Sequence, residues 1–141
     1  MKVRYPYWAT YMKVNGKKVK AGKDGYVEVK SKKLKVKSGK FIAEIEFGMG
    51  LHEEATKDDH SRVALLYGPI VLGGRLADVA YPFSDPTKHN DYDTFDYGKH
   101  PDMKLCDVKH LGGLRFQNSD GTPIAPFYDM QHCRYVVYWR K

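Results

Sequence analysis

The sequence predicts an all-β fold: a two-sheet antiparallel β-sandwich of jelly-roll-like type with one long irregular loop excursion. Three observations lead to this expectation. Apolar and polar residues alternate in short runs, as strands with one buried face require. Turn signals separate these runs at short intervals. One run, Arg62–Tyr67, is apolar on both faces and suits the centre of a sheet. The 141 residues fit a single domain, 1–141.

The N-terminal part is predicted to hold short strands joined by tight turns. The aromatic run Val3–Trp8 is expected to be a strand, and Pro6 within it indicates an edge or a bulge. Asn15-Gly16 joins two alternating runs and signals a hairpin strongly, because both turn residues need positive φ. The other strands expected here are Tyr11–Val14, Lys17–Lys20, Tyr26–Val29 and Leu34–Val36.

Phe41–Phe47 shows the clearest alternation in the chain and is predicted as one continuous strand. Glu44 and Glu46 fall on one face, while the aromatic and aliphatic residues fall on the other. A further strand is expected over Leu51–Glu54, followed by a polar loop at residues 56–61.

The central strand Arg62–Tyr67 is expected to end at the turn Gly68-Pro69, because these residues would also stop a helix there. Ile70–Leu72 follows before Gly73-Gly74. Periodicity is then lost, and a long loop region is predicted at about 78–112. The last strands are expected at Leu114–Phe116, Ile124–Tyr128 and Arg134–Trp139.

The long loop holds the candidate binding residues, since it mixes carboxylates with aromatic rings. Sugars use both groups: hydroxyls donate to carboxylates, and C–H faces stack on rings. The same rings would equally serve to cap the core. The candidate glycan or interface contacts are Tyr92, Asp93, Phe95, Tyr97 and His100.

No catalytic residue, cofactor or metal site is expected from motifs, because the chain has no phosphate loop, nucleophile elbow or His-Glu-x-x-His. Oxygen and nitrogen ligands for Ca²⁺ or Mn²⁺ gather at 52–60, but their spacing favours a polar hairpin loop. These residues are His52, Glu53, Glu54, Asp58, Asp59 and His60. Cys106 and Cys133 leave the disulfide state open.

Charge is spread unevenly along the chain. Residues 1–40 hold 12 Lys and one Arg against Asp24 and Glu28, a net charge of +11, while the remainder carries −4. Lys33, Lys35 and Lys37 alternate with apolar residues, which favours a solvated strand face over a basic patch. Nucleic acid is therefore an unlikely partner, although a basic module that binds acidic polysaccharide or nucleic acid stays an alternative.

Three stretches together resemble the β-L-arabinofuranosidase-type glycoside hydrolases of family 127, in their Bacteroides-type form. They are Val3–Ala9 with Val14–Lys17 and Gly25–Val27, then Arg62–Gly74, and finally Pro126–Asp129 with Arg134–Trp139. The second, RVALLYGPIVLGG, is the most specific. Residues 75–113 match least, and Lys33-Leu34-Lys35 departs from the family's Arg-x-Trp.

In that family a helical barrel carries the cysteine nucleophile, the zinc and the acid/base glutamate, and the quoted stretches are similar to the β-sandwich regions that follow it. The resemblance therefore implies a non-catalytic C-terminal accessory domain, inactive alone. It would brace the barrel domain of a parent enzyme and contact plant-type glycan. The second reading is an independent carbohydrate-binding module.

An isolated module would expose the apolar patch that met the barrel and would tend to self-associate. No apolar run approaches the roughly 18 residues that span a bilayer, so no membrane partner is expected. No export signal is recognised, and the location stays open, with a periplasmic or secreted parent as one expectation.

Overall fold

The computed structural model of the chain describes residues 1–30, 35–37, 39–78, 103–131 and 133–141. These residues form antiparallel sheets, so the predicted all-β, sandwich-like fold class is confirmed. The chain divides into unit 1, Met1–His52 with Tyr67–Pro69, and unit 2, Glu53–Leu66 with Ile70–Lys141. The assignment of the chain to a single domain stays a prediction. Within the described residues, no helix is long and apolar enough to cross a membrane.

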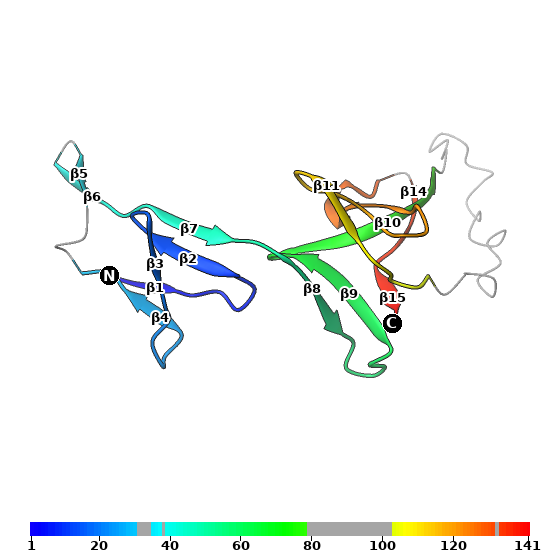
Figure 1. Cartoon of the computed structure of the whole chain (residues 1–141), viewed down its shortest axis with the longest axis horizontal. Helices are drawn as coiled ribbons and strands as arrows, with labels where there is room; N and C mark the ends of the chain where they lie inside the picture. The colour runs from blue at the N-terminus through cyan, green and yellow to red at the C-terminus, as the bar shows by residue number, and fades with distance from the viewer. Residues whose placement is uncertain (31–34, 38, 79–102, 132) are drawn as a thin grey trace, which may run out of the picture. The chain divides into compact units, whose positions relative to one another are not determined.

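Unit 1 packs a two-stranded ribbon and a three-stranded sheet around one small apolar core (Figure 1). Its strands are β1 (Lys2–Arg4), β2 (Tyr11–Val14), β3 (Lys17–Val19), β4 (Tyr26–Glu28), β5 (Lys35–Lys37), β6 (Lys40–Ile42) and β7 (Ile45–Gly48). β1 pairs with β4, β2 lies between β3 and β7, and β5 pairs with β6. The core holds Met12, Val14, Val27 and Val29.

The predicted Asn-Gly hairpin is confirmed. Asn15 and Gly16 have φ of 49° and 80°, the left-handed values that this turn needs, and β2 and β3 pair on either side of it. The strand predicted over Val3–Trp8 is wrong beyond Arg4, because the chain turns there: the amide of Ala9 donates to the carbonyl of Pro6 at 3.1 Å.

Phe41–Phe47 is not one strand, which corrects the prediction. β6 ends at Ile42 and β7 begins at Ile45. Asn15 occupies the gap: its amide donates to the carbonyl of Glu44 at 2.8 Å, and its side-chain oxygen accepts from the amide of Glu44 at 2.9 Å. The side-chain alternation nevertheless holds around the gap, since Ala43, Ile45 and Phe47 pack on the core.

The lysine-rich hairpin differs from its predicted form. Val36 in β5 is 66% exposed, so within the described residues this strand does not bury the apolar face that its alternation predicts. β5 pairs with β6. The alternation of the sequence predicts an apolar face for β5, but it cannot show whether another layer covers Val36, and none does among the described residues.

Unit 2 is an eight-stranded sheet (Figure 1). Its strands are β8 (Leu51–Ala55), β9 (Arg62–Tyr67), β10 (Ile70–Asp78), β11 (Lys109–Gly112), β12 (Arg115–Gln117), β13 (Pro123–Pro126), β14 (Cys133–Val136) and β15 (Tyr138–Arg140). The main path runs β11-β12-β13-β10-β9-β15, while β14 pairs with β10 and β8 with β9. The core is formed by Val63, Leu65, Leu72, Phe116, Ile124 and Trp139.

β9 confirms the predicted central strand, since it pairs with β8, β10 and β15. β10 is longer than expected, because Gly73 and Gly74 continue the strand instead of ending it. A Cβ on Gly74 would lie 2.7 Å from Cζ2 of Trp139, so glycine here makes room for the indole ring of the core. This use of glycine inside a strand is a close-packing device.

Two further C-terminal elements differ from the prediction. Arg134–Trp139 is two strands, because the chain leaves β10 after Val136 and pairs with β9 from Tyr138. Ile124–Tyr128 is extended only to Pro126, after which Phe127–Asp129 forms a 3₁₀ turn, labelled η4. Lys109–Gly112 is strand β11, so the irregular region predicted at about 78–112 ends earlier than expected; residues 79–102 lie outside the described part.

Candidate functional site

The binding residues predicted from the sequence lie in the segment 79–102, outside the described residues. This applies to Tyr92, Asp93, Phe95, Tyr97 and His100, whose role as glycan or interface contacts stays a prediction. The described part of unit 2 carries two other candidate surfaces, a groove and a group of exposed aromatic side chains.

The groove lies on the outer face of β9, and strand register explains which side chains reach it. Tyr138 pairs with Ala64, and Trp139 pairs with Val63. Directly opposed residues of an antiparallel pair project from the same face of the sheet. Trp139 and Val63 are buried, at 0% and 2% exposed, so they mark the inner face. Tyr138 and Ala64 therefore project from the outer face, and Tyr138 is 56% exposed there.

The groove has a volume of about 670 Å³. β8 and the loop after it contribute polar side chains, whereas β9, β10 and the end of the chain contribute mostly apolar ones. The lining residues are Glu54, Ala55, Thr56, Lys57, Asp58, Arg62, Ala64, Leu66, Val71, Val137 and Tyr138. Ala64 is small, and its position opposite Tyr138 leaves open space beside the tyrosine ring.

The loop beside the groove is held by its own hydrogen bonds. The hydroxyl of Thr56 donates to the carbonyl of Asp59 at 2.7 Å, and the carboxylate of Asp59 accepts from the hydroxyl and the amide of Ser61 at 2.6 and 2.9 Å. The two bonds from Ser61, chiefly that from its hydroxyl, lower the pKa of Asp59 below its ordinary value, and the positive charge of Arg62 acts in the same direction. Nε of Arg62, a residue that lines the groove, lies 3.4 Å from this carboxylate.

The second surface is the aromatic ledge, formed by Phe127, Tyr128 and Tyr135. These side chains are 42%, 60% and 47% exposed. The rings of Phe127 and Tyr135 meet edge to face with centroids 5.2 Å apart, so η4 and β14 are joined by a ring contact at the surface. Large exposed rings that are grouped in this way are typical of interaction sites.

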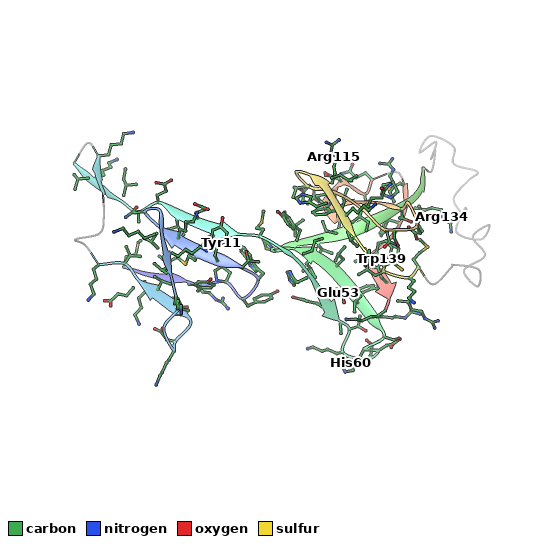
Figure 2. The ribbon with its side chains drawn as sticks, viewed as in Figure 1. Tyr11, Glu53, His60, Arg115, Arg134 and Trp139 are labelled. Carbon is green, nitrogen blue, oxygen red and sulfur yellow. The ribbon has the colours of Figure 1, made fainter. Side chains whose placement is uncertain are left out.

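The residues considered as oxygen and nitrogen ligands at 52–60 do not come together. In the part of the chain that the structure describes, no three His, Cys, Asp or Glu side chains are placed to hold a metal ion. Glu53 forms an ion pair with Lys141 at 2.8 Å, and Asp59 is bound by Ser61. Figure 2 shows Glu53 and His60 at separate places, near β8 and on the loop that follows it.

The two cysteines are free thiols: Cys106 is exposed, and Cys133 is partly buried beside Met130, with the sulfur atoms 4.0 Å apart. His132 lies outside the described residues. The amide of Cys106 donates to the side chain of Asn118 at 2.9 Å, which ties the chain before β11 to the buried Asn118.

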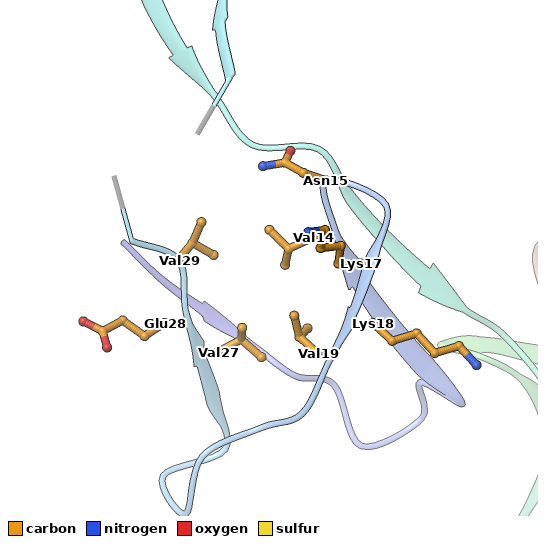
Figure 3. A pocket seen from close by; sticks show the side chains of 8 residues that line it. All are labelled: Val14, Asn15, Lys17, Lys18, Val19, Val27, Glu28 and Val29. Atoms are coloured by element: carbon orange, nitrogen blue, oxygen red, sulfur yellow. The ribbon is translucent and has the colours of Figure 1, made fainter. Parts of the chain in front are cut away.

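Unit 1 has an apolar pocket of about 420 Å³ between β4 and the hairpin of β2 and β3. Val14, Val19, Val27 and Val29 point into it in Figure 3, while the charged ends of Lys18 and Glu28 point away. Three of these valines belong to the buried core of the unit. The pocket is therefore an extension of the core, and its other lining residues are Asn15, Lys17, Lys18 and Glu28.

Lys13 of β2 and Lys18 of β3 share their face of the sheet with an acidic residue, Glu46. Glu46 accepts from the hydroxyl of Tyr11 at 2.7 Å and from Lys13 at 2.9 Å, and both contacts lower the pKa of Glu46. The same contacts raise the pKa of Tyr11 and of Lys13. Lys18 lies 5.6 Å from the centroid of the Tyr11 ring. The basic-module hypothesis stays a prediction.

Sequence reasoning missed both surfaces of unit 2. It placed Ala64 and Tyr138 in strands, but their cross-strand pairing depends on a register that neither local pattern contains. The cluster Phe127-Tyr128 was expected to be extended, and its 3₁₀ turn is what exposes the rings. The run of aromatic residues near the C-terminus was the available signal.

Comparison of the chain with models of protein families and with curated proteins gives no match. The fold and the geometry of the two surfaces are therefore the basis for inference about function.

Proposed function

We propose that this chain is a non-catalytic β-sandwich accessory module of a glycoside hydrolase similar to the β-L-arabinofuranosidase type, and that it braces the catalytic domain of that enzyme. The aromatic ledge carries the proposal. Phe127, Tyr128 and Tyr135 keep about half of their surface exposed. Aromatic side chains with large exposed area are the residues that dominate the energy of protein interfaces.

The second and third of the stretches that resemble the hydrolase family build the part of the eight-stranded sheet that holds the ledge. Arg62–Gly74 forms β9 and the first part of β10, and the C-terminal stretches form η4, β14 and β15. Gly74 of the first stretch packs against Trp139 of the last. The second and third stretches thus share a structural task, which is to fix the sheet that presents the ledge.

The docking test uses the chain together with the helical-barrel domain expected to be encoded with it. We expect the two to co-purify when expressed as separate polypeptides. Phe127→Ser with Tyr135→Ser should abolish co-purification, because truncating central aromatic contacts typically weakens an interface by tenfold or more. The matched control is Tyr26→Ser, which replaces a tyrosine of unit 1 that is 42% exposed.

Two outcomes contradict this proposal. One is a coding sequence without a catalytic domain, and the other is co-purification that the double substitution leaves unchanged. The chain alone should also release no product from an aryl β-L-arabinofuranoside, and measurable turnover by it would overturn the non-catalytic assignment.

The second candidate function is an independent carbohydrate-binding module, which the groove on β9 favours. This groove combines an exposed tyrosine ring with two carboxylates, Glu54 and Asp58. It uses residues of unit 2 other than those of the aromatic ledge, so the two candidates are separable by mutation.

A further inference from the structure

We propose that the groove on the outer face of β9 binds a neutral oligosaccharide, with the ring of Tyr138 as the stacking platform and Ala64 as the floor. The inference rests on the second candidate function, and it gives that function a site and a ligand class.

The platform is rigid, which lowers the entropic cost of binding. Tyr138 pairs with Ala64 in the sheet, and its neighbour Trp139 is fully buried. The amide of Arg140 donates to the carbonyl of Met103, and the amide of Leu105 donates to the carbonyl of Arg140, both at 2.8 Å. β15 is therefore held on both edges, so little backbone freedom remains to be lost when a ligand binds.

The space beside the ring has the size of a small-molecule site. The groove volume of about 670 Å³ falls within the roughly 300–1,000 Å³ typical of such sites. Ala64 leaves this space because a larger side chain opposite Tyr138 would fill it. Leu66 and Val71 extend the apolar surface, which suits the C–H face of a sugar ring.

The polar groups at the groove match the hydroxyl groups of a sugar. The carboxyl oxygens of Glu54 and Asp58 can accept hydrogen bonds, and sugar hydroxyls donate them. Arg62 supplies donor groups at the groove, and its Nε lies 3.4 Å from the carboxylate of Asp59. The loop with Asp58 is already ordered by the bonds that Thr56 and Ser61 make to Asp59.

Charge balance points to a neutral ligand. Two carboxylates, Glu54 and Asp58, and two cations, Lys57 and Arg62, line the groove. Because these charges balance, the groove offers a polyanion no net electrostatic attraction. The groove is thus poorly suited to nucleic acid or acidic polysaccharide, whichever function unit 1 has.

The test is a titration of the complete chain with arabinohexaose, xylohexaose and cellohexaose at millimolar concentrations, followed by ¹H–¹⁵N NMR and calorimetry. At least one neutral hexasaccharide should shift the amide signals of β8, β9 and β15, and hexagalacturonate should bind more weakly. Tyr138→Ala and Ala64→Leu should each weaken binding about tenfold, as loss of a central aromatic contact does.

The controls separate stacking from folding and from docking. Tyr138→Phe keeps the ring and should bind within about twofold of the native chain. Tyr128→Ala removes a ring of the aromatic ledge that is 60% exposed and should leave affinity unchanged. The proposal is overturned if no neutral hexasaccharide binds, or if binding survives Tyr138→Ala and Ala64→Leu. If no neutral hexasaccharide binds while the native chain still co-purifies with the barrel domain, only the groove assignment has failed.

Discussion

At the scale of single residues, the core of unit 2 depends on the missing side chain of Gly74. An added Cβ would lie 2.7 Å from Cζ2 of Trp139 and 2.9 Å from Cγ1 of Val136. Trp139 is fully buried and its ring has no space to move. Figure 2 shows this indole within unit 2. The glycine is therefore required by packing, since its φ is not positive.

Gly74→Ala should lower the free energy of unfolding by about 1–3 kcal/mol, the usual cost of overpacking a core. Gly73→Ala is the matched control, because its Cβ would meet Cγ of Met130 at 3.2 Å, and a methionine side chain adapts easily. Both substitutions reduce the entropy of the unfolded chain equally. Urea denaturation measures the difference, and equal midpoints for the two variants would contradict this account.

At the scale of elements, Asn15 decides where two strands end. Its backbone closes the turn between β2 and β3, while its amide and side chain bind the backbone of Glu44, where β6 and β7 are separated. One residue thus ends the pairing of β2 with both of its neighbours. The turn and the strand break share this single cause.

Substitutions at Asn15 should separate its two contributions to stability. Asn15→Gly keeps the left-handed turn but loses the side-chain hydrogen bond, and should cost about 1 kcal/mol. Asn15→Ala loses the bond and strains the turn, and should cost about 2 kcal/mol or more. Thermal unfolding of both variants checks the order. Finding Ala as stable as Gly here would refute the role assigned to the turn conformation.

Sequence patterns predicted the strands whose bounds depend on neighbouring residues. They failed where the bounds depend on pairing with residues far away in the sequence. The bounds of β2 follow from alternation and from the Asn-Gly turn beside it. The break before Ile45 depends on Asn15, far away along the chain. The break at Val137 arises because the C-terminal run changes its pairing from β10 to β9. The groove has the same origin, since only this second pairing places Tyr138 opposite Ala64.

At the scale of the whole molecule, carboxylates in both units are ionised more readily than usual. Asp24 accepts from Lys2 at 2.8 Å, and this bond holds the pKa of Asp24 below its ordinary value of 3.8. In unit 2 the amide of Thr122 donates to Asp120 at 2.8 Å, which lowers the pKa of Asp120 in the same direction. Glu46 and Asp59 have lowered pKa values as well. Folding therefore favours the charged form at each of these positions.

The direction of the pKa shifts predicts acid destabilisation in a defined window. The folded pKa of each carboxyl lies below its ordinary value, which is 3.8 for Asp and 4.5 for Glu. The contribution of each ionised carboxylate to the free energy of unfolding is therefore complete when the pH lies above that ordinary value. It is lost as the pH falls through the lower folded values. The urea midpoint should therefore be constant near neutral pH and fall steadily below about pH 4.

The donors to Asp24 and Asp120 differ in charge, which makes the acid effect testable residue by residue. Lys2 is a cation, so about 1 M NaCl should weaken its contribution through screening, whereas the bond from the neutral Thr122 amide should persist. Asp120→Asn should lower stability at pH 7 and lose its effect in acid, where the native carboxyl is protonated as well. Asp107→Asn, at an exposed carboxyl, is the control. If Asp120→Asn lowers the free energy of unfolding by the same amount at pH 2 and at pH 7, the contribution of Asp120 to stability does not depend on its ionisation.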